Sequence, residues 1–474
     1  MDLFQLPSAR IRAGVSREDI TPPADIFSRC WGASLHDQAS SIHHPFTVTA
    51  LALQPIDDGD ARVILALDLS WFEEAENRKF LAQVRDGARL RPDQLIVNLS
   101  HSHAAPNLSH SLADRPGGDR IAPYFEGVVA ASIRTVCTAL SDMQQAWITA
   151  DYGRCSLAVN RNYPDESLGE PVCGFNPHVT TDDTLAYARV AADDGRTIAS
   201  ILNYGCHPTS LGPANRSLSP DYIAAARAIV EDTFGGHCLF LISPCGDTAP
   251  REGYAADPEV ADRNGRQLGH AAASTATSLL PPGEQLVYTG PLISGATLAT
   301  WARRPMGVTD DTTLVRSELL EIELPLRAKV GVAALEAERD ERLAQLEAAK
   351  RSGDESAIRN ATALVERSRR AVLREPDLPV GDSLTLPVWV WQFGRIVVIA
   401  LPAEPFSDLQ VALRRRFPSL CVIVGMNSNG AHGYVMPECD YGRGLYQEDI
   451  SPAGRGSLEG IEQSVTTVLE RWAY

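Results

Sequence analysis

The stretch ARVILALDLSWF (residues 61–72) is followed by an amphipathic segment near 75–88 and then by LIVNLS (95–100). The two apolar runs are short and bounded by polar residues, which is typical of buried strands. The amphipathic segment between them predicts a helix. This strand–helix–strand order is the first unit of a layered α/β fold.

The same order continues along the chain. Further buried strands are expected at AWITADYGRC (146–155), CLFLIS (238–243) and CVIVGM (421–426). Hairpins are expected at 185–205, turning at Asp193, Asp194 and Gly195, and at 388–401, turning at Phe393, Gly394 and Arg395. Helices are expected near 122–141, 220–234, 258–279, 406–416 and 457–471. We therefore predict an α/β fold with a mixed β-sheet and helices on both faces, in one domain over residues 1–474.

Residues 326–375 differ from the rest because they are rich in Ala, Leu, Glu, Lys and Arg. Gly353 and Asp354 divide this stretch into two helical arms. An amphipathic helical hairpin on the surface is the simpler interpretation, and an oligomer contact or a lid is the alternative. A homo-oligomer formed through these helices is therefore one hypothesis.

Composition excludes several classes of protein. Hydrophobic residues make up 44% and charged residues 22% of the 474 residues, which is typical of a globular chain. The net charge of −17 argues against a nucleic-acid-binding protein and against stable association with anionic membranes. No apolar run reaches the roughly 20 residues that span a bilayer. Nine irregularly spaced cysteines with no CxxC, and an N-terminus without a secretory signal, favour a cytoplasmic protein with reduced thiols.

Polar side chains follow five of the expected strands directly. The groups are His101-Ser102-His103, Cys206-His207, Cys245-Gly246-Asp247, Ala403-Glu404 and Asn427-Ser428-Asn429. Ligands of open α/β sheets bind beyond the carboxyl ends of the strands. If these strands are parallel neighbours, the five groups meet at one edge and form the candidate site for a small-molecule substrate.

The sequence His101-Ser102-His103 places two imidazoles on one side of an extended segment. Such a pair can bind zinc, or one imidazole can bind while the other transfers protons, but packing pairs of this spacing also occur. Taken alone, His207 is more typical of a hydrogen-bonded structural histidine than of a metal ligand. Glu404 precedes Pro405 and a helix, so taken alone it is more typical of an acid at a helix N-terminus than of a metal ligand.

The motifs together resemble the neutral/alkaline, non-lysosomal ceramidase family. The segments AGVSREDITPP (13–23), IHHPFTVTALAL (42–53), LSHSHAAPN (99–107), NRN (160–162), NYGCHPTSL (203–211), CGDTAP (245–250), LPAEPF (401–406) and GYVMPECDYGRGLYQ (433–447) are each similar to a family motif. They occur in the family's order and cover most of the chain. The joint order is more specific than any one motif.

The resemblance implies a zinc enzyme that hydrolyses an amide and binds one ion. His101 and His207 match the family's histidine ligands, Glu404 matches its carboxylate ligand, and Tyr434 matches its tyrosine ligand. Zinc with an open position lowers the pKa of a water and polarises a carbonyl.

Other positions carry over as catalytic candidates. His103 or the neighbouring carboxylate of Asp247 is expected to accept and return the proton. Arg161 and Tyr446 match residues that line the family's active site, and either is expected to stabilise the oxyanion. His43 matches the histidine of the IH motif and is a candidate substrate contact.

Several departures from the family concern the substrate. The family's serine falls on Ala249, and the asparagine that follows falls on Arg251, whereas Thr248 lies one position away. Arg251 and Thr248 are candidate substrate contacts, and Arg251 paired with Arg161 would suit a carboxylate or phosphate group. The alternative for Arg251 is an ion pair with Asp247 or Glu252. We expect the family's C-terminal β-sandwich to be absent, and a smaller, more polar substrate than ceramide.

Three functions remain open at this stage. The first is a zinc-dependent hydrolase of a C–N bond in a small polar, anionic substrate. The second uses the same metal as a Lewis acid in a lyase or isomerase step on a hydroxy acid or sugar acid. The third is a non-catalytic, metal-stabilised binding protein that uses the helices of residues 326–375.

Overall fold

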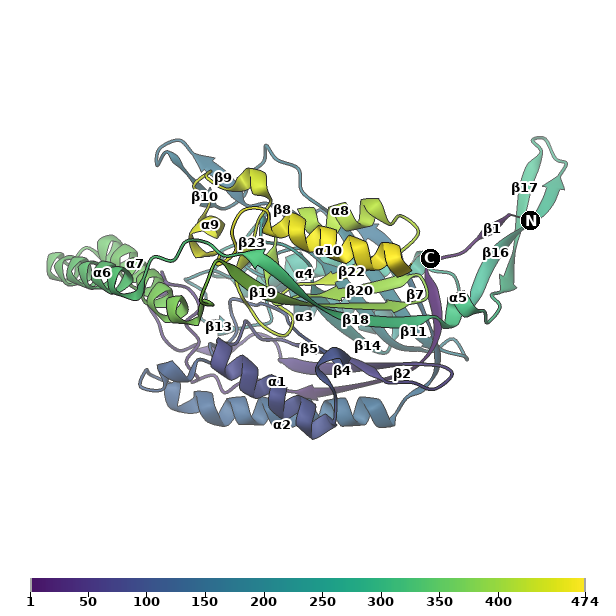
Figure 1. Cartoon of the computed structure of the whole chain (residues 1–474), viewed down its shortest axis with the longest axis horizontal. Helices are drawn as coiled ribbons and strands as arrows, with labels where there is room; N and C mark the ends of the chain where they lie inside the picture. Colours follow the sequence, from purple (N-terminus) through teal and green to yellow (C-terminus); the bar gives the residue numbers. More distant parts are fainter. Residues whose placement is uncertain (1, 473–474) are drawn as a thin grey trace.

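The computed structural model describes residues 2–472 and contains two stacked β-sheets (Figure 1). The larger sheet has eight strands. In spatial order they are β14 (His237–Ile242), β12 (Thr197–Tyr204), β11 (Thr184–Ala192), β7 (Gln144–Arg154), β2 (Ser8–Asp19), β4 (Thr47–Pro55), β5 (Arg62–Leu67) and β6 (Leu95–Leu99). The pairs β5–β6 and β12–β14 are parallel and the others antiparallel, so the predicted α/β class with a mixed sheet is confirmed.

The smaller sheet covers one face of the larger one. Its strands lie in the order β18 (Val315–Pro325), β19 (Ser383–Phe393), β20 (Ile396–Ala400) and β22 (Cys421–Gly425). Apolar side chains of both sheets, such as Ile11, Ile148, Trp391 and Val398, form one buried layer between them. The helices therefore lie on the outer face of each sheet, not on both faces of a single sheet.

Each outer face has its own helices and its own core. On the larger sheet, α1 (Glu74–Ala88) and α2 (Ile121–Ser141) pack on β4–β6, and α3 (Tyr222–Phe234) and α4 (Pro258–Ser278) pack on β11, β12 and β14. The smaller sheet is covered by α8 (Asp408–Arg416) and α10 (Ser457–Trp472). In Figure 1, α1 and α2 run along the bottom and α8 and α10 along the top, with the strands between them.

Both expected hairpins form where the sequence placed them. The strands β11 and β12 join at Asp193–Gly195, and β19 and β20 join at Gly394–Arg395. Gly195 and Gly394 have φ angles of +85° and +53°, a region in which glycine costs least. Local turn chemistry was therefore sufficient to predict both connections.

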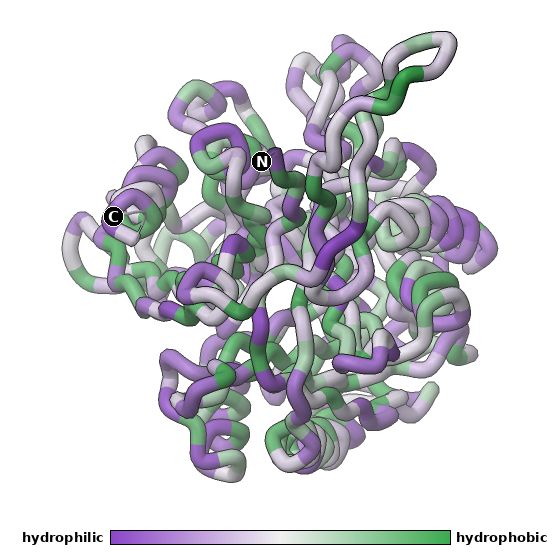
Figure 2. The backbone as a smooth tube through the Cα atoms, turned by 90° about the vertical axis from the view of Figure 1, so that its right-hand side faces the viewer, coloured by the Kyte–Doolittle hydropathy of each residue, from purple (hydrophilic) through white to green (hydrophobic). Residues whose placement is uncertain are grey.

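Two further excursions leave the stacked sheets. The predicted helical hairpin consists of α6 (Val332–Ser352) and α7 (Glu355–Arg374), which project from one end of the molecule in Figure 1. At the opposite end, β16 (Glu284–Leu292) and β17 (Leu298–Pro305) form a hairpin that the sequence analysis did not identify. Figure 2 views the molecule from that end, where hydrophobic and hydrophilic segments are interspersed. The oligomer contact through residues 326–375 stays a prediction.

The edge strands of the larger sheet meet at the carboxyl end of β22. Although β14 and β6 lie at opposite edges, Ile242 of β14 donates its N–H to the Asn98 side chain of β6 (3.1 Å). Asn98 in turn donates to the Met426 carbonyl (2.7 Å) and to Ser428 Oγ (2.9 Å), which follow β22. The larger sheet is therefore strongly curved, as right-handed twist accumulated over eight strands permits. This curvature brings the ends of β6, β14 and β22 together.

No helix among residues 2–472 combines the length and the apolar character needed to cross a bilayer.

Candidate metal centre

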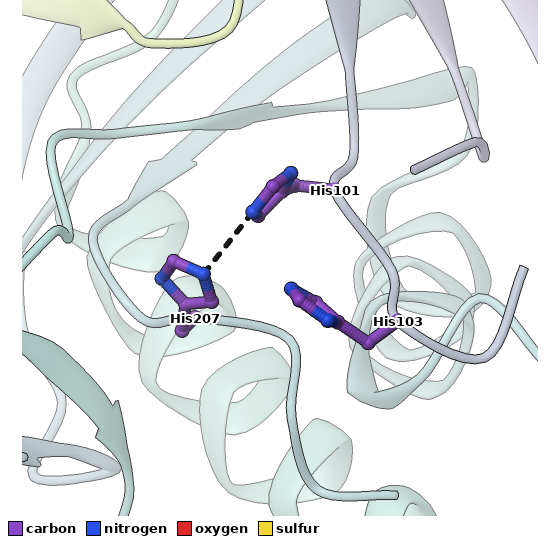
Figure 3. Close-up of side chains that lie close together, drawn as sticks. All are labelled: His101, His103 and His207. Atoms are coloured by element: carbon purple, nitrogen blue, oxygen red, sulfur yellow. Dashed lines mark hydrogen bonds between the residues drawn. The ribbon is translucent and has the colours of Figure 1, made fainter. Parts of the chain in front are cut away.

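Three imidazoles from distant parts of the chain point toward one another at the end of the curved sheet (Figure 3). His101 and His103 follow β6, and His207 follows β12. The Nε2 atoms of His101 and His207 are 3.1 Å apart. The ring centres of His101 and His103 are 4.9 Å apart.

The two imidazoles of His101 and His103 converge for a different reason from the one predicted. His101 has a φ of +65°, the left-handed region, so the segment is not extended there. His103 stacks between Trp31 and Trp71, whose ring centres lie 5.0 Å and 5.7 Å from it. A turn and aromatic packing, and not strand alternation, therefore set the relative position of these rings.

Glu404 completes the cluster from the smaller sheet. Its Oε2 lies 3.5 Å from His101 Nε2 and 3.7 Å from His207 Nε2. It belongs to the short strand β21 (Glu404–Pro405), which pairs in parallel with β23 (Tyr434–Val435), so Glu404 and Tyr434 are register partners. The Tyr434 hydroxyl accepts a hydrogen bond from Arg161 Nη2 (2.9 Å).

The geometry of these atoms fits one divalent cation. From the three distances, the point equidistant from His101 Nε2, His207 Nε2 and Glu404 Oε2 lies about 2.0 Å from each. Zn–N and Zn–O bonds in proteins are about 2.0–2.2 Å long. Glu404 Oε2 is buried and has no hydrogen-bond partner among the described residues, a costly arrangement unless a cation satisfies it.

The hydrogen bonds at the Nδ1 atoms of His101 and His207 leave the Nε2 lone pairs of both rings available. His207 Nδ1 donates to the Cys245 carbonyl (3.2 Å), so its Nε2 carries no proton in the neutral ring. His101 Nδ1 lies 3.1 Å from Asn427 Nδ2, while Asn427 Oδ1 is buried without a partner. Because the two amide orientations have the same shape, turning the Asn427 amide places Oδ1 on Nδ1–H and satisfies both groups.

Burial and charge favour neutral imidazoles beside an ionised carboxylate. Burial lowers the pKa of His103 and of His207, and the Arg161 charge lowers both further. Burial alone would raise the pKa of Glu404, but His101, Arg161 and the Tyr434 hydroxyl bring it below its usual value. Neutral imidazole and carboxylate are the forms that bind metals.

Arg161 and Tyr446 lie around this centre. Arg161 is buried, and its Nε and Nη2 donate to the Gly246 carbonyl (3.0 and 2.7 Å), which fixes the guanidinium beside Tyr434. The rings of Tyr446 and Tyr434 meet edge to face, with centres 6.3 Å apart. Tyr446 is 40% exposed, so on this side the centre approaches the surface, and we call this side the mouth of the site.

Four of the predicted site residues lie outside the cluster of imidazoles: Asp247, Thr248, Arg251 and His43. The Asp247 carboxylate accepts hydrogen bonds from Ser407 N (2.7 Å) and Ser407 Oγ (2.8 Å), at the start of α8. It lines a separate polar cavity of about 640 Å³, and burial raises its pKa to about 6. Thr248 Oγ1 is buried and donates to the Gly205 carbonyl (3.0 Å). Neither side chain is free to contact a substrate at the imidazoles.

Arg251 and His43 are the other two. Arg251 is exposed and donates to the Ser156 carbonyl (3.3 Å). The alternative ion pair with Asp247 or Glu252 is not found among residues 2–472, where Glu252 pairs with Arg263 instead. His43 bonds to Ser219 Oγ (3.0 Å) and to Asp262 (3.2 Å), and His44 bonds to the same carboxylate. This His43–His44–Asp262 group is distinct from the three imidazoles.

Trp31 and Trp71, whose rings contact His103, were not among the predicted site residues. Trp71 belongs to the quoted stretch ARVILALDLSWF, four residues after β5 ends. The position of Trp71 shortly after a predicted strand was the feature of the sequence that could have indicated it as a site residue.

Comparison with known proteins agrees with this architecture, although no family model matches the chain. The structure is similar to the crystal structure of neutral ceramidase from Pseudomonas aeruginosa, with a TM-score of 0.68 and 16% sequence identity. That alignment covers 98% of this chain and 74% of the ceramidase chain. A second structure, described as ceramidase complexed with C2, has a TM-score of 0.66 and 15% identity, and the alignment covers 98% and 76% of the two chains. The chain therefore has the fold of neutral ceramidase.

Proposed function

We propose that the chain is a zinc-dependent hydrolase that cleaves an amide C–N bond in a small polar, anionic substrate. The observation that supports this most directly is the triangle formed by His101 Nε2, His207 Nε2 and Glu404 Oε2, whose equidistant point lies about 2.0 Å from each atom. The similarity of the surrounding fold to that of neutral ceramidase supports the same proposal.

In this proposal, His101, His207 and Glu404 would hold a zinc ion, and Tyr434, the register partner of Glu404, would be a further donor. A bound zinc ion acts as a Lewis acid, lowering the pKa of water and polarising a carbonyl. Asn427 and the Cys245 carbonyl orient the two imidazoles through their Nδ1 atoms.

His103 is the proposed proton carrier. Its Nε2 is buried and has no hydrogen-bond partner among residues 2–472, so it is free to accept a proton from water. The same atom can return that proton to the departing amine. Asp247 is not proposed for this step because Ser407 occupies both of its oxygens.

Tyr446 and Arg161 are assigned different roles. Arg161 already donates to Gly246 and Tyr434, so it positions the Tyr434 hydroxyl. No hydrogen bond engages the Tyr446 hydroxyl within the described residues, and Tyr446 lies at the mouth. It is therefore the proposed donor to the carbonyl oxygen as negative charge develops there.

A cytoplasmic location is part of the same proposal. All nine cysteines are free thiols, three of them exposed, which suits a reducing compartment.

The test begins with metal content. The wild-type chain should take up one equivalent of zinc, His101→Ala should not, and His178→Ala, which alters an exposed histidine, should behave as wild type. The loaded protein is then incubated with a mixture of N-acylated metabolites in ¹⁸O-labelled water. Hydrolysis places one ¹⁸O in the released acid, whereas a lyase or isomerase product without label, or a chain that takes up no zinc, would contradict the proposal.

A further inference from the structure

The helix α7 lies against the loop that carries Trp31, beside the candidate metal centre. The Arg370 Nη2 donates to the Cys30 carbonyl (2.9 Å), and its guanidinium lies 5.9 Å from the centre of the Trp71 ring. The Trp71 ring is in turn 5.8 Å from His101 and 5.7 Å from His103. Arg370 is therefore separated from the imidazoles by one aromatic ring.

The same helix also reaches the opposite side of the mouth. Arg367 pairs with Asp449, and its guanidinium lies 5.9 Å from the centre of the Tyr446 ring. Tyr446 contacts Tyr434 edge to face. The helix α7 thus extends from the Trp71 side of the centre to the Tyr446 side, and Arg370 and Arg374 lie on the part of it nearest the body.

Two guanidinium groups on this part of α7 have no carboxylate partner. Within residues 2–472, neither Arg370 nor Arg374 forms an ion pair, and Arg374 forms no hydrogen bond, although both are half-buried. Neighbouring arginines are paired: Arg367 with Asp449, Arg369 with Glu366, and Arg327 with Glu375.

The shortage of partners is local, because the chain has 60 acidic residues and a net charge of −17. Burial lowers the pKa of Arg374, and Tyr446 and Glu73 only partly offset this while Arg370 and Arg327 add to it. Half-buried cations without counterions are unfavourable in the free protein and favourable for an anionic ligand.

We propose that Arg370 and Arg374 form an anion-binding subsite, distinct from the site of the reacting carbonyl, that binds a carboxylate or phosphate group of the substrate. This assigns the anion specificity to α7 and not to the exposed Arg251. The position of the scissile amide at the imidazoles rests on the proposed function, whereas oxyanion binding by the two arginines does not.

The test measures binding of two probes, succinate and inorganic phosphate, to the full chain by calorimetry. The variants are Arg370→Gln and Arg374→Gln, and the matched control is Arg359→Gln, an exposed arginine on the same helix. Each of the first two substitutions should weaken binding about tenfold, since each removes a charge-assisted hydrogen bond, and the control should bind as wild type. Preference for succinate or phosphate identifies which oxyanion the subsite takes.

Several results would overturn the subsite. They are wild-type binding of both probes weaker than the millimolar range, or equal affinities in wild type, Arg370→Gln and Arg374→Gln. Arg370→Lys, which keeps the charge, guards against a folding defect and should retain more affinity than Arg370→Gln. If zinc uptake fails while binding depends on the arginines, the subsite stands and the hydrolase proposal falls. If hydrolysis is established and the arginines have no effect on binding, only the subsite is wrong.

Discussion

The substitution Asn98→Ala tests whether one side chain joins the two edges of the larger sheet at the candidate metal centre. Asn98 is 1% exposed and makes three hydrogen bonds, with Ile242 N, the Met426 carbonyl and Ser428 Oγ. Ser428 Oγ keeps other partners in the variant, but the Ile242 N–H loses its acceptor in the interior. The structure therefore predicts a loss of both stability and metal affinity.

The magnitude follows from the groups left unsatisfied. An orphaned buried donor costs about 1–3 kcal/mol, and the weakened contact at Met426 about 1 kcal/mol more, so the free energy of unfolding should fall by about 3 kcal/mol. An unfolding entropy of about 2.1 cal/mol/K per residue is about 1 kcal/mol/K for 474 residues. The Tm should thus fall by about 3 °C. Zinc should bind about tenfold more weakly, because His101 lies three residues after Asn98.

Calorimetric melting and zinc titration of the same preparations provide the two readouts. The control is Asn360→Ala, which alters an exposed asparagine within α7. A Tm for Asn98→Ala within about 1 °C of wild type would refute the reasoning, because the buried N–H would then have found another acceptor at no cost.

Three further predictions concern the centre and its surroundings. Asn427→Ala should weaken zinc binding about 10- to 100-fold, because His101 Nδ1 loses its partner; an unchanged calorimetric affinity would contradict this. Chelation of zinc present at a hundred times its Kd should lower the Tm by about 3 °C in wild type and not in His207→Ala, and equal shifts in both would argue against His207 as a ligand. Burial raises the pKa of Asp247 to about 6 in the folded chain. Its carboxyl therefore adds about 3 kcal/mol to the free energy of unfolding below about pH 4, and this stabilisation is lost as the pH rises through 6. Asp247→Asn should therefore gain about 3 °C in Tm relative to wild type between pH 4 and pH 7, and a constant difference across that range would rule the effect out.

The sequence predicted the elements of the fold better than their assembly. Strands β5, β6, β14 and β22 were recognisable because an apolar run ends at a polar residue, which is local information. The stacking of two sheets, and the meeting of β6 with β14, depend on pairing between segments far apart in the chain. No local pattern encodes which strand edges face each other.

The candidate site shows the same division. His101, His207, Glu404 and Tyr434 were identified because the order of their motifs resembles a known family, and the structure brings them together. Trp71 and Arg370 were missed for different reasons. Trp71 follows β5 outside any recognised motif, and Arg370 approaches the centre only because α7 packs against Trp71. Arg370 contacts Cys30 across 340 positions of sequence, a contact that amphipathic helix periodicity does not predict.

Backbone geometry indicates that the fold contributes to the position of the imidazoles. His101 and Asn427, whose side chains meet, both have left-handed φ angles, +65° and +47°. Asparagine tolerates this region, but for His101 it costs roughly 1–2 kcal/mol, and such strain persists only where surrounding structure enforces it. The hydrogen bonds of Asn98 to Met426 and Ser428 hold the segment of His101 against the segment of Asn427. The apolar layers on the two faces of the larger sheet are complete without the candidate ligands. A centre held in this way needs little rearrangement to accept zinc, so the metal-free chain should keep the same fold and lose only the increment of stability that binding adds.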